Sequence, residues 1–208
     1  MNWRVGPLLW VVLLLALFCP AQTAPDKPPP PLPYVDPDAY YVYSAIVPTL
    51  PIYQSAGTVV IQRETAPRND LGTPRQCLHG DKQFQDEYAE VFDDYEQENR
   101  SARLLEPNFD FDKPFDFIST DDFLRSAAAS RRGGSPWQDF FRRFPDSGGY
   151  VVVSAVGFNS AKTAAILYIG RKCGRDCGGG SYHVMENRDG RWQEVSLIEP
   201  SCSSNHGG

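Results

Sequence analysis

The sequence lacks any apolar run long enough to cross a bilayer as a helix. Its longest such run, from Leu8 to Phe18, has eleven residues, whereas a membrane-spanning helix needs about 20. The run follows a positive charge at Arg4 and precedes the small residue Ala21, which is the pattern of a secretory signal peptide. We therefore predict a signal peptide over residues 1–21, export of the rest of the chain to the periplasm or the medium, and no transmembrane segment.

Cysteine is scarce, and its number indicates how it is used. Cys19 follows Phe18, whereas a lipoprotein signal has a small residue before its cysteine, so we do not expect a lipoprotein. Removal of residues 1–21 leaves four cysteines, and an even number in an exported chain predicts disulfide bonds. Four cysteines allow three pairings, of which we predict one that closes a small ring and anchors the C-terminal tail. The two predicted bonds are Cys173–Cys177 and Cys77–Cys202.

Basic residues are too few for a nucleic-acid-binding protein, and histidines are too few for a structural zinc site. Without the signal peptide the chain has 19 Lys and Arg against 26 Asp and Glu, and this acidity argues against nucleic acid as a partner. The three histidines are His79, His183 and His206. A structural zinc site needs four ligands, and Cys173, Cys177 and His183 supply only three, of which two are expected to form a disulfide. We predict neither a metal nor a cofactor.

The predicted mature chain begins with a proline-rich leader. Residues 22–37 include PDKPPPPLPYVDP, from Pro25 to Pro37, and such a composition favours an extended polyproline II spacer. Segments of this kind can also be ligands for aromatic grooves. The remaining residues, 38–208, are enough for one domain with a core and too few for two.

Helical patterns occupy the part of the chain before Gly149. Asp36 and Pro37 are typical of a helix start, and the apolar AYYVYSAIV that follows predicts a mostly buried helix ending at Pro48. The segment from Lys82 to Asn99 has an apolar stripe at helical spacing. Its members are Phe84, Tyr88, Val91, Phe92 and Tyr95. Two further helices are predicted to start at Ser119 and at Ser135, the second with a capping box.

Strand patterns dominate after Gly149. Four runs predict strands, at 150–158, 163–172, 181–187 and 191–199, joined by short connections. Short connections make hairpins, so these strands predict an antiparallel meander. A further short strand is predicted from Thr58 to Arg63. The fold class is therefore predicted as α+β, with N-terminal helices packed on a C-terminal four-stranded antiparallel meander sheet.

Charge is segregated along the chain. Between Asp81 and Asp122 there are 14 acidic and 4 basic residues, and between Phe123 and Arg175 there are 9 basic and 2 acidic residues. Either these two parts face each other, or the surface has two regions of opposite sign. A basic patch for an anionic component of the cell envelope is one interpretation of four arginines: Arg131, Arg132, Arg142 and Arg143.

Several segments resemble a family of exported bacterial proteins. The resemblance runs from about Tyr40 to Cys202, and its most specific parts are GFNSAKTAAILYIG at 157–170 and CGRDCGGGSYHVMENRDGRW at 173–192. It implies an exported bacterial protein with the domain limits given above. The family has no known activity, so the resemblance assigns no role to any residue.

The segment CGRDCGGGSY is the main candidate site, and it allows several interpretations. A thiol oxidoreductase would place a reactive cysteine at a helix N-terminus, whereas strands are predicted on both sides of this segment. Three consecutive glycines with neighbouring basic residues could instead form a loop that binds an anion. The candidate ligand residues are Arg171, Arg175, Gly178, Gly179, Gly180 and His183. The simplest interpretation is a turn closed by a disulfide between two strands.

These patterns predict an exported, non-enzymatic domain that binds or interacts with a component of the cell envelope. The alternative is an envelope enzyme, a hydrolase or a thiol oxidoreductase, centred on the loop from Cys173 to His183. We assign no catalytic residue. For the hydrolase, Arg175 and His183 would have to converge in a cleft.

Overall fold

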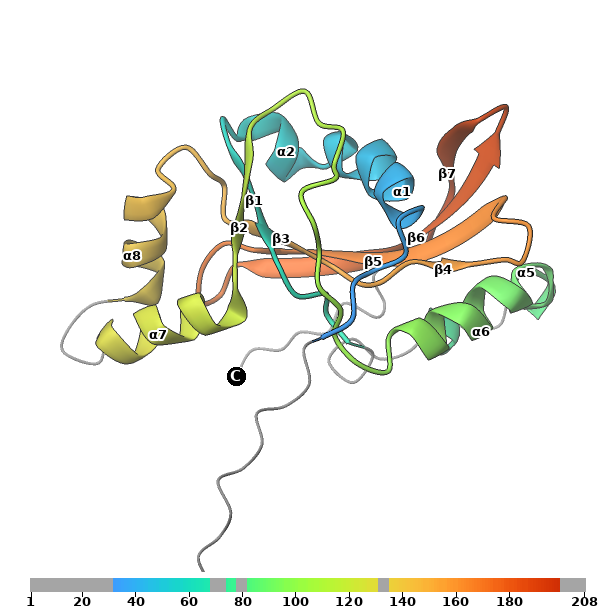
Figure 1. Cartoon of the computed structure of the whole chain (residues 1–208), viewed down its shortest axis with the longest axis horizontal. Coiled ribbons are helices and arrows are strands. Elements are labelled where there is room, and N and C mark those ends of the chain that lie inside the picture. The colour runs from blue at the N-terminus through green and yellow to red at the C-terminus, as the bar shows by residue number, and fades with distance from the viewer. Residues whose placement is uncertain (1–31, 68–73, 78–81, 131–134, 199–208) are drawn as a thin grey trace, which may run out of the picture. The chain divides into compact units, whose positions relative to one another are not determined.

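The structure, a computed structural model, describes residues 32–67, 74–77, 82–130 and 135–198, which form three layers (Figure 1). The middle layer is a seven-stranded sheet with the strand order β2-β1-β3-β5-β6-β7, and β4 also pairs with β5. One face is covered by α1, a short 3₁₀ helix η1 and α2. The other face is covered by α5 and α6 at one end and by α7 and α8 at the other (Figure 1).

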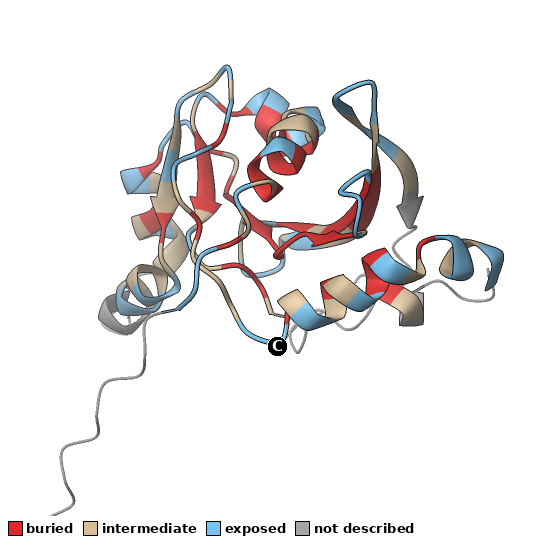
Figure 2. Cartoon of the chain, turned by 45° about the vertical axis from the view of Figure 1, so that its right-hand side comes forward, coloured by how far each residue is buried: buried red, intermediate tan, exposed pale blue. Residues whose placement is uncertain are grey.

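The seven strands lie between residues 59 and 198 of the chain. Their bounds are β1 Val59–Gln62, β2 Phe115–Ile118, β3 Tyr150–Val153, β4 Gly157–Phe158, β5 Ala164–Lys172, β6 Gly178–Arg188 and β7 Arg191–Ile198. The helices are α1 Ala39–Ile46, η1 Val47–Thr49, α2 Pro51–Ser55, α4 Pro74–Cys77, α5 Lys82–Glu87, α6 Ala89–Glu98, α7 Thr120–Ser130 and α8 Pro136–Arg143. Figure 2 shows that buried residues concentrate on the sheet and on the helix sides that face it.

Alternate residues of each strand enter different cores, because neighbouring side chains of a strand point to opposite faces. On the face covered by α1, the largest cluster joins Tyr43 and Ile46 of the helix to Val151, Leu167 and Met185 of the sheet. The opposite face holds two separate clusters. One packs α6 against β5 and β6, and the other packs α7 and α8 against β1, β2 and β3.

The fold class is α+β, but the predicted four-stranded meander is wrong as a description of the whole sheet. β1 pairs in parallel with β2 on one side and with β3 on the other, joining Val60 to Asp116 and to Tyr150. Helices also lie on both faces rather than on one. A strand buried on both faces needs such cover, and the continuous apolar run VVI of β1 is typical of a parallel strand.

The predicted hairpins form the antiparallel half of this mixed sheet. β5 pairs with β6 and β6 pairs with β7, both antiparallel. The turn between β6 and β7 consists of Asp189 and Gly190, whose φ angles of 53° and 79° are positive. Two positive φ angles in an Asp-Gly pair are typical of a type I′ hairpin turn, whose twist matches that of the strands.

Three predicted segments begin or divide differently in the structure. Helix α1 begins at Ala39 rather than beside Asp36, and the Asp36 carboxylate accepts a hydrogen bond from the backbone N–H of Asp38. The predicted helix 82–99 is divided into α5 and α6 at Tyr88. The end of the predicted leader packs on the domain, since the Val35 N–H donates to the Leu104 carbonyl oxygen. The capping box at Ser135 is confirmed.

The predicted strand 150–158 is interrupted by a bulge that a buried asparagine holds. Val153 pairs with Ile169, but Gly157 pairs with Ile166, so one extra residue lies on the β3–β4 side. Asn99, at the end of α6, is fully buried. Its side-chain amide donates to the carbonyl oxygen of Ala155 at 3.0 Å, and its side-chain oxygen accepts from the Ala155 N–H at 2.8 Å. Asn99 therefore satisfies backbone groups that the bulge removes from the ladder.

We expect Asn99→Ala to lower the free energy of unfolding by about 2 kcal/mol, because it leaves the Ala155 N–H buried without a partner. The Ala155 carbonyl oxygen keeps its hydrogen bond from the Ser154 hydroxyl. Urea denaturation measures the change. Gln97→Ala, an exposed position on the same helix, is the control and should change stability by less than about 0.5 kcal/mol. Equal stabilities of the two variants would show that the bulge does not depend on the amide.

Candidate functional site

The cysteine loop between β5 and β6 is a disulfide-closed turn. Cys173 and Cys177 form a disulfide bond, as predicted, and the Cys173 N–H donates to the Cys177 carbonyl oxygen at 3.0 Å. A guanidinium nitrogen of Arg171 lies 3.4 Å from the Cys177 sulfur. Strands lie on both sides, so the bond holds the end of a hairpin. The other predicted bond, Cys77–Cys202, lies outside the residues whose side chains are described.

The three glycines after Cys177 are strand residues. Gly178, Gly179 and Gly180 begin β6 and pair with Lys172, Arg171 and Gly170 of β5. None has a positive φ, so the predicted anion-binding nest of left-handed residues does not form. Gly180 has a packing role instead, since a Cβ there would lie 2.2 Å from the hydroxyl oxygen of Tyr168. The ring of Tyr168 needs this glycine beneath it.

His183 lies in a hydrogen-bonded line with two polar neighbours. Its Nε2 is 2.9 Å from the Ser181 hydroxyl oxygen, and its Nδ1 is 2.7 Å from a carboxylate oxygen of Glu194. The same types of atom make up a nucleophile, a base and an orienting carboxylate in hydrolases. The His183 side chain is only 5% exposed, however, and the two hollows described below are lined by other residues. We assign the line to anchoring β7 on β6.

Arg175 and His183 do not converge in one accessible place. His183 is buried on the sheet face that α1 covers, because it pairs with Leu167 of that core. Arg175 is exposed within the disulfide loop, so the convergence that the hydrolase interpretation needed is missing. Across the described segments, no three His, Cys, Asp or Glu residues are grouped as metal ligands would be.

Arginines surround a shallow hollow between α7 and α8. The hollow has a volume of about 530 Å³, and it is lined by Arg125, Ser126, Asp139, Arg142 and Arg143. Two of the arginines pair with aspartates of their own helices, namely Asp122 and Asp139. Such exposed pairs are weak and can open. The predicted arginines at positions 131 and 132 lie outside the described residues, and the anionic partner stays a prediction.

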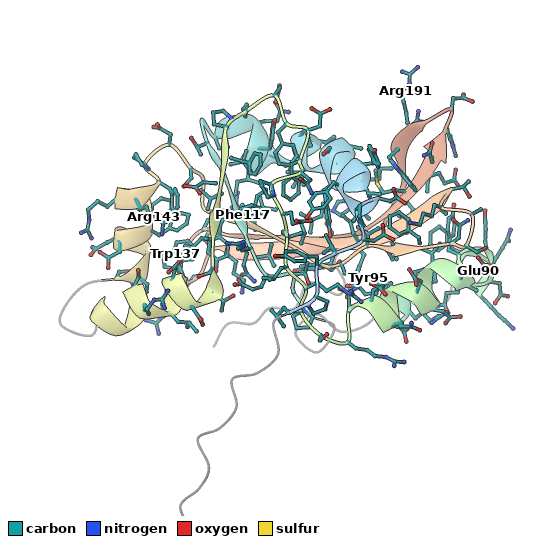
Figure 3. All side chains as sticks on the ribbon, in the orientation of Figure 1. Glu90, Tyr95, Phe117, Trp137, Arg143 and Arg191 are labelled. Atoms are coloured by element: carbon teal, nitrogen blue, oxygen red, sulfur yellow. A yellow bond between two sulfur atoms is a disulfide. The ribbon has the colours of Figure 1, made fainter. Side chains whose placement is uncertain are left out.

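The acidic segment packs partly on the basic one, since Asp94 and Glu90 of α6 accept hydrogen bonds from the N–H groups of Phe158 and Ser160. The acidic helix α6 and the arginines of α8, however, lie apart. The acidic α6 packs at the β5–β6 end of one sheet face, and α8 packs over β1 and β3 at the other end of the same face (Figure 3 labels Glu90 on α6 and Arg143 on α8). The acidic side chains of α6 and the arginines of α8 are therefore at opposite ends of this sheet face.

A second concave site is a groove beside α1. It has a volume of about 550 Å³, which is within the range of small-molecule sites. Three segments distant in sequence form its walls: residues 37–45 at α1, residues 108–110, and residues 190–192 at the start of β7. The Asp189–Gly190 turn positions the last segment, and the Ser44 hydroxyl accepts from the Asp110 N–H at 2.9 Å, which joins the first two.

Aromatic rings form much of the groove lining. Tyr41 is 69% exposed, the most exposed large side chain among the described apolar and aromatic residues. Trp192 is partly buried, and its ring centre is 5.9 Å from that of Phe158. Tyr40 is buried, and its hydroxyl oxygen accepts from the Glu106 N–H. Burial raises the pKa of Tyr40, so this ring stays neutral at physiological pH.

The groove also holds polar side chains that have no partner among the described residues. In the part of the chain that the structure describes, the side chains of Tyr41, Asn108, Asp110 and Arg191 make no hydrogen bond or ion pair with the protein. Figure 3 shows Arg191 projecting from the end of the β6–β7 hairpin. Aromatic faces and available polar groups in one groove are the features that can orient a polar ligand.

This groove was not predicted from the sequence. Tyr41 was predicted within a mostly buried helix, and Arg191 and Trp192 were considered only as strand residues. One feature of the sequence could have indicated part of it. An Asp-Gly hairpin turn followed by Arg and Trp places both side chains at an exposed end of a sheet.

Comparisons with known proteins add no relative. No family model, no curated protein and no solved structure matches the chain. The resemblance to exported bacterial proteins therefore stays a prediction. Within the described residues, no helix is both long and apolar enough to span a membrane.

Proposed function

We propose that this chain is an exported bacterial protein of the cell envelope, and that it acts as a binding domain without enzymatic activity. Its ligand occupies the groove formed by α1, residues 108–110 and the β6–β7 hairpin. The observation that carries the proposal is the groove itself. There Tyr41 and Trp192 lie beside polar side chains that make no hydrogen bond or ion pair with the described residues.

The burial pattern around α1 supports this proposal. Five of the eight residues of α1 are buried against the sheet, yet Tyr41 is turned outward. An exposed tyrosine is an amphipathic contact group that loses little conformational freedom on binding.

The enzymatic alternative has less support. A hydrolase needs a nucleophile, a base and substrate access in one place. His183 is buried whereas Arg175 is exposed, so the two do not form one accessible site. A thiol oxidoreductase needs an activated cysteine, and Cys173 and Cys177 lie between two strands rather than at a helix N-terminus.

Binding at the groove can be followed by tryptophan emission. A chain of residues 22–208 has only Trp137 and Trp192, so Trp137→Phe leaves Trp192 as the sole reporter. The probes are a neutral N-acetylglucosamine tetramer, a glycan of the same length containing N-acetylmuramic acid, and a peptide of residues 25–34. We expect a saturable change in emission with at least one probe, and recovery of that probe unchanged.

Two tyrosines provide a matched comparison in this assay. Tyr41→Ala removes the groove ring and should weaken binding at least about tenfold, a change of about 1.4 kcal/mol. Tyr34→Ala removes a ring that is 52% exposed and outside the groove lining, and it should have no effect. The absence of a saturable response to all three probes would overturn the groove as a binding site, and conversion of the bound probe would favour the enzyme.

A further inference from the structure

We infer that the groove binds a saccharide carrying a carboxylate, with the sugar on the aromatic side chains and the carboxylate on Arg191. This inference rests on the proposed function and adds the chemical class of the ligand. The residues that line the groove indicate this class of ligand.

The aromatic side chains favour a sugar ring. A pyranose has an apolar face made of C–H groups and a rim of hydroxyls, so it packs on an aromatic face while its rim makes hydrogen bonds. Tyr41 and Trp192 supply aromatic surface, and the face of an aromatic ring carries the negative potential that C–H groups prefer. A purely apolar ligand would leave the polar groups of the groove without partners, which lowers affinity.

The wall at residues 108–110 suits the hydroxyl and N-acetyl groups of a sugar. The Asp110 carboxylate can accept hydrogen bonds from two hydroxyls, and the Asn108 amide can both donate and accept. Both residues are exposed. The Ser44 hydroxyl already accepts from the Asp110 N–H, which leaves its own proton for a ligand oxygen.

The opposite wall suits an anion. Arg191 is exposed at the start of β7 and brings a positive charge to the groove. A guanidinium donates two parallel hydrogen bonds to a carboxylate, a geometry that lysine cannot reproduce. Asp110 lies on a different segment, so the groove has a wall that accepts hydrogen bonds from hydroxyls and a wall that donates to an anion. A ligand that matches both has hydroxyls at one end and a carboxylate at the other.

The two glycans of the emission assay separate this inference from the proposed function. They share the N-acetylated sugar backbone, and only the second carries lactyl carboxylates. With Trp192 as the sole reporter, we expect the acidic glycan to bind about tenfold more tightly than the neutral one at low ionic strength. Salt should reduce the difference, because the ion pair is exposed.

Arg191→Gln should bring the affinity for the acidic glycan down to that for the neutral glycan, and Arg191→Lys should recover only part of the difference. The control is Arg188→Gln, the same change of charge on the same hairpin. Arg188 pairs with Glu186 and is outside the groove lining. Circular dichroism and thermal unfolding check that each variant is folded.

Equal affinities for the two glycans, or a preference that survives Arg191→Gln, would overturn the inference while the groove stays a binding site. Tight binding of the proline-rich peptide with no binding of either glycan would have the same meaning. If no probe binds, the proposed function fails with it.

Discussion

Replacing Gly157 with alanine is expected to unfold the domain or to lower its free energy of unfolding by about 3 kcal/mol or more. Gly157 lies in β4 on the sheet face beneath α6. A Cβ at this position would lie 2.4 Å from the backbone nitrogen of Tyr95 and 2.5 Å from its Cα. Those atoms belong to a helix and cannot rotate away as a side chain could, so α6 would have to move off the sheet.

The matched control is Gly179→Ala, since a Cβ at Gly179 meets nothing within 4 Å. This exposed strand residue has no positive φ, so alanine there should change stability little or raise it slightly. Urea denaturation of both variants gives the comparison. A Gly157→Ala protein as stable as the control would mean that α6 does not pack directly on β4.

Raising the pH above about 10 is expected to unfold the chain steeply. Burial raises the pKa of Tyr43 and Tyr95 well above the ordinary value of 10.0, and it raises the pKa of Tyr150 to about 12. Burial also raises the pKa of Tyr182, and it raises that of Tyr88 together with a hydrogen bond to Glu186. The folded chain therefore keeps these rings neutral at a pH where the unfolded chain ionises them.

The direction of the effect follows from the raised values. A raised folded-state pKa contributes stability that is complete below pH 10 and is lost as the pH rises toward the folded-state value. Above pH 10, each fully buried tyrosine lowers the free energy of unfolding by up to about 1.4 kcal/mol per pH unit. Tyr43 and Tyr95 together therefore lower it by up to about 2.8 kcal/mol per pH unit. Absorbance at 295 nm and circular dichroism should change together. Gradual ionisation of all tyrosines near pH 10 with the fold intact would contradict this.

The features predicted correctly from sequence depend on residues close together in the chain. The capping box at Ser135 links residues three positions apart. The apolar stripe from Phe84 to Tyr95 packs in one cluster, although the helix is divided at Tyr88. The Asp189–Gly190 turn similarly acts on its immediate neighbours. These signals do not depend on what packs against them.

The missed part of the fold depends on distant pairing. β1 was predicted as a strand, but nothing near Val60 indicates that it pairs with Asp116 and Tyr150. β2 was not predicted, because its four residues include Asp116 and follow a stretch rich in aspartate and proline. The parallel half of the sheet could not be derived from local patterns.

The groove was missed for a similar reason. Its walls come from segments near residues 40, 109 and 191, and only the fold brings them together. The cysteine–glycine segment is made of rare residue types, yet its glycines are strand residues, and one of them, Gly180, lies beneath Tyr168. Part of this unusual composition reflects a structural constraint, because the Tyr168 ring leaves no room for a side chain at Gly180.

The mixed sheet has a consequence for the order in which the chain folds. β5, β6 and β7 follow one another through short turns, so their contacts close small loops and can form early. Pairing of β1 with β3 joins residues 60 and 150, and closing so long a loop costs more entropy. We expect the antiparallel half to be structured in the folding transition state, with β1 and β2 docking afterwards. Substitutions in β1 should then accelerate unfolding, while those in the β5–β6 hairpin should slow folding.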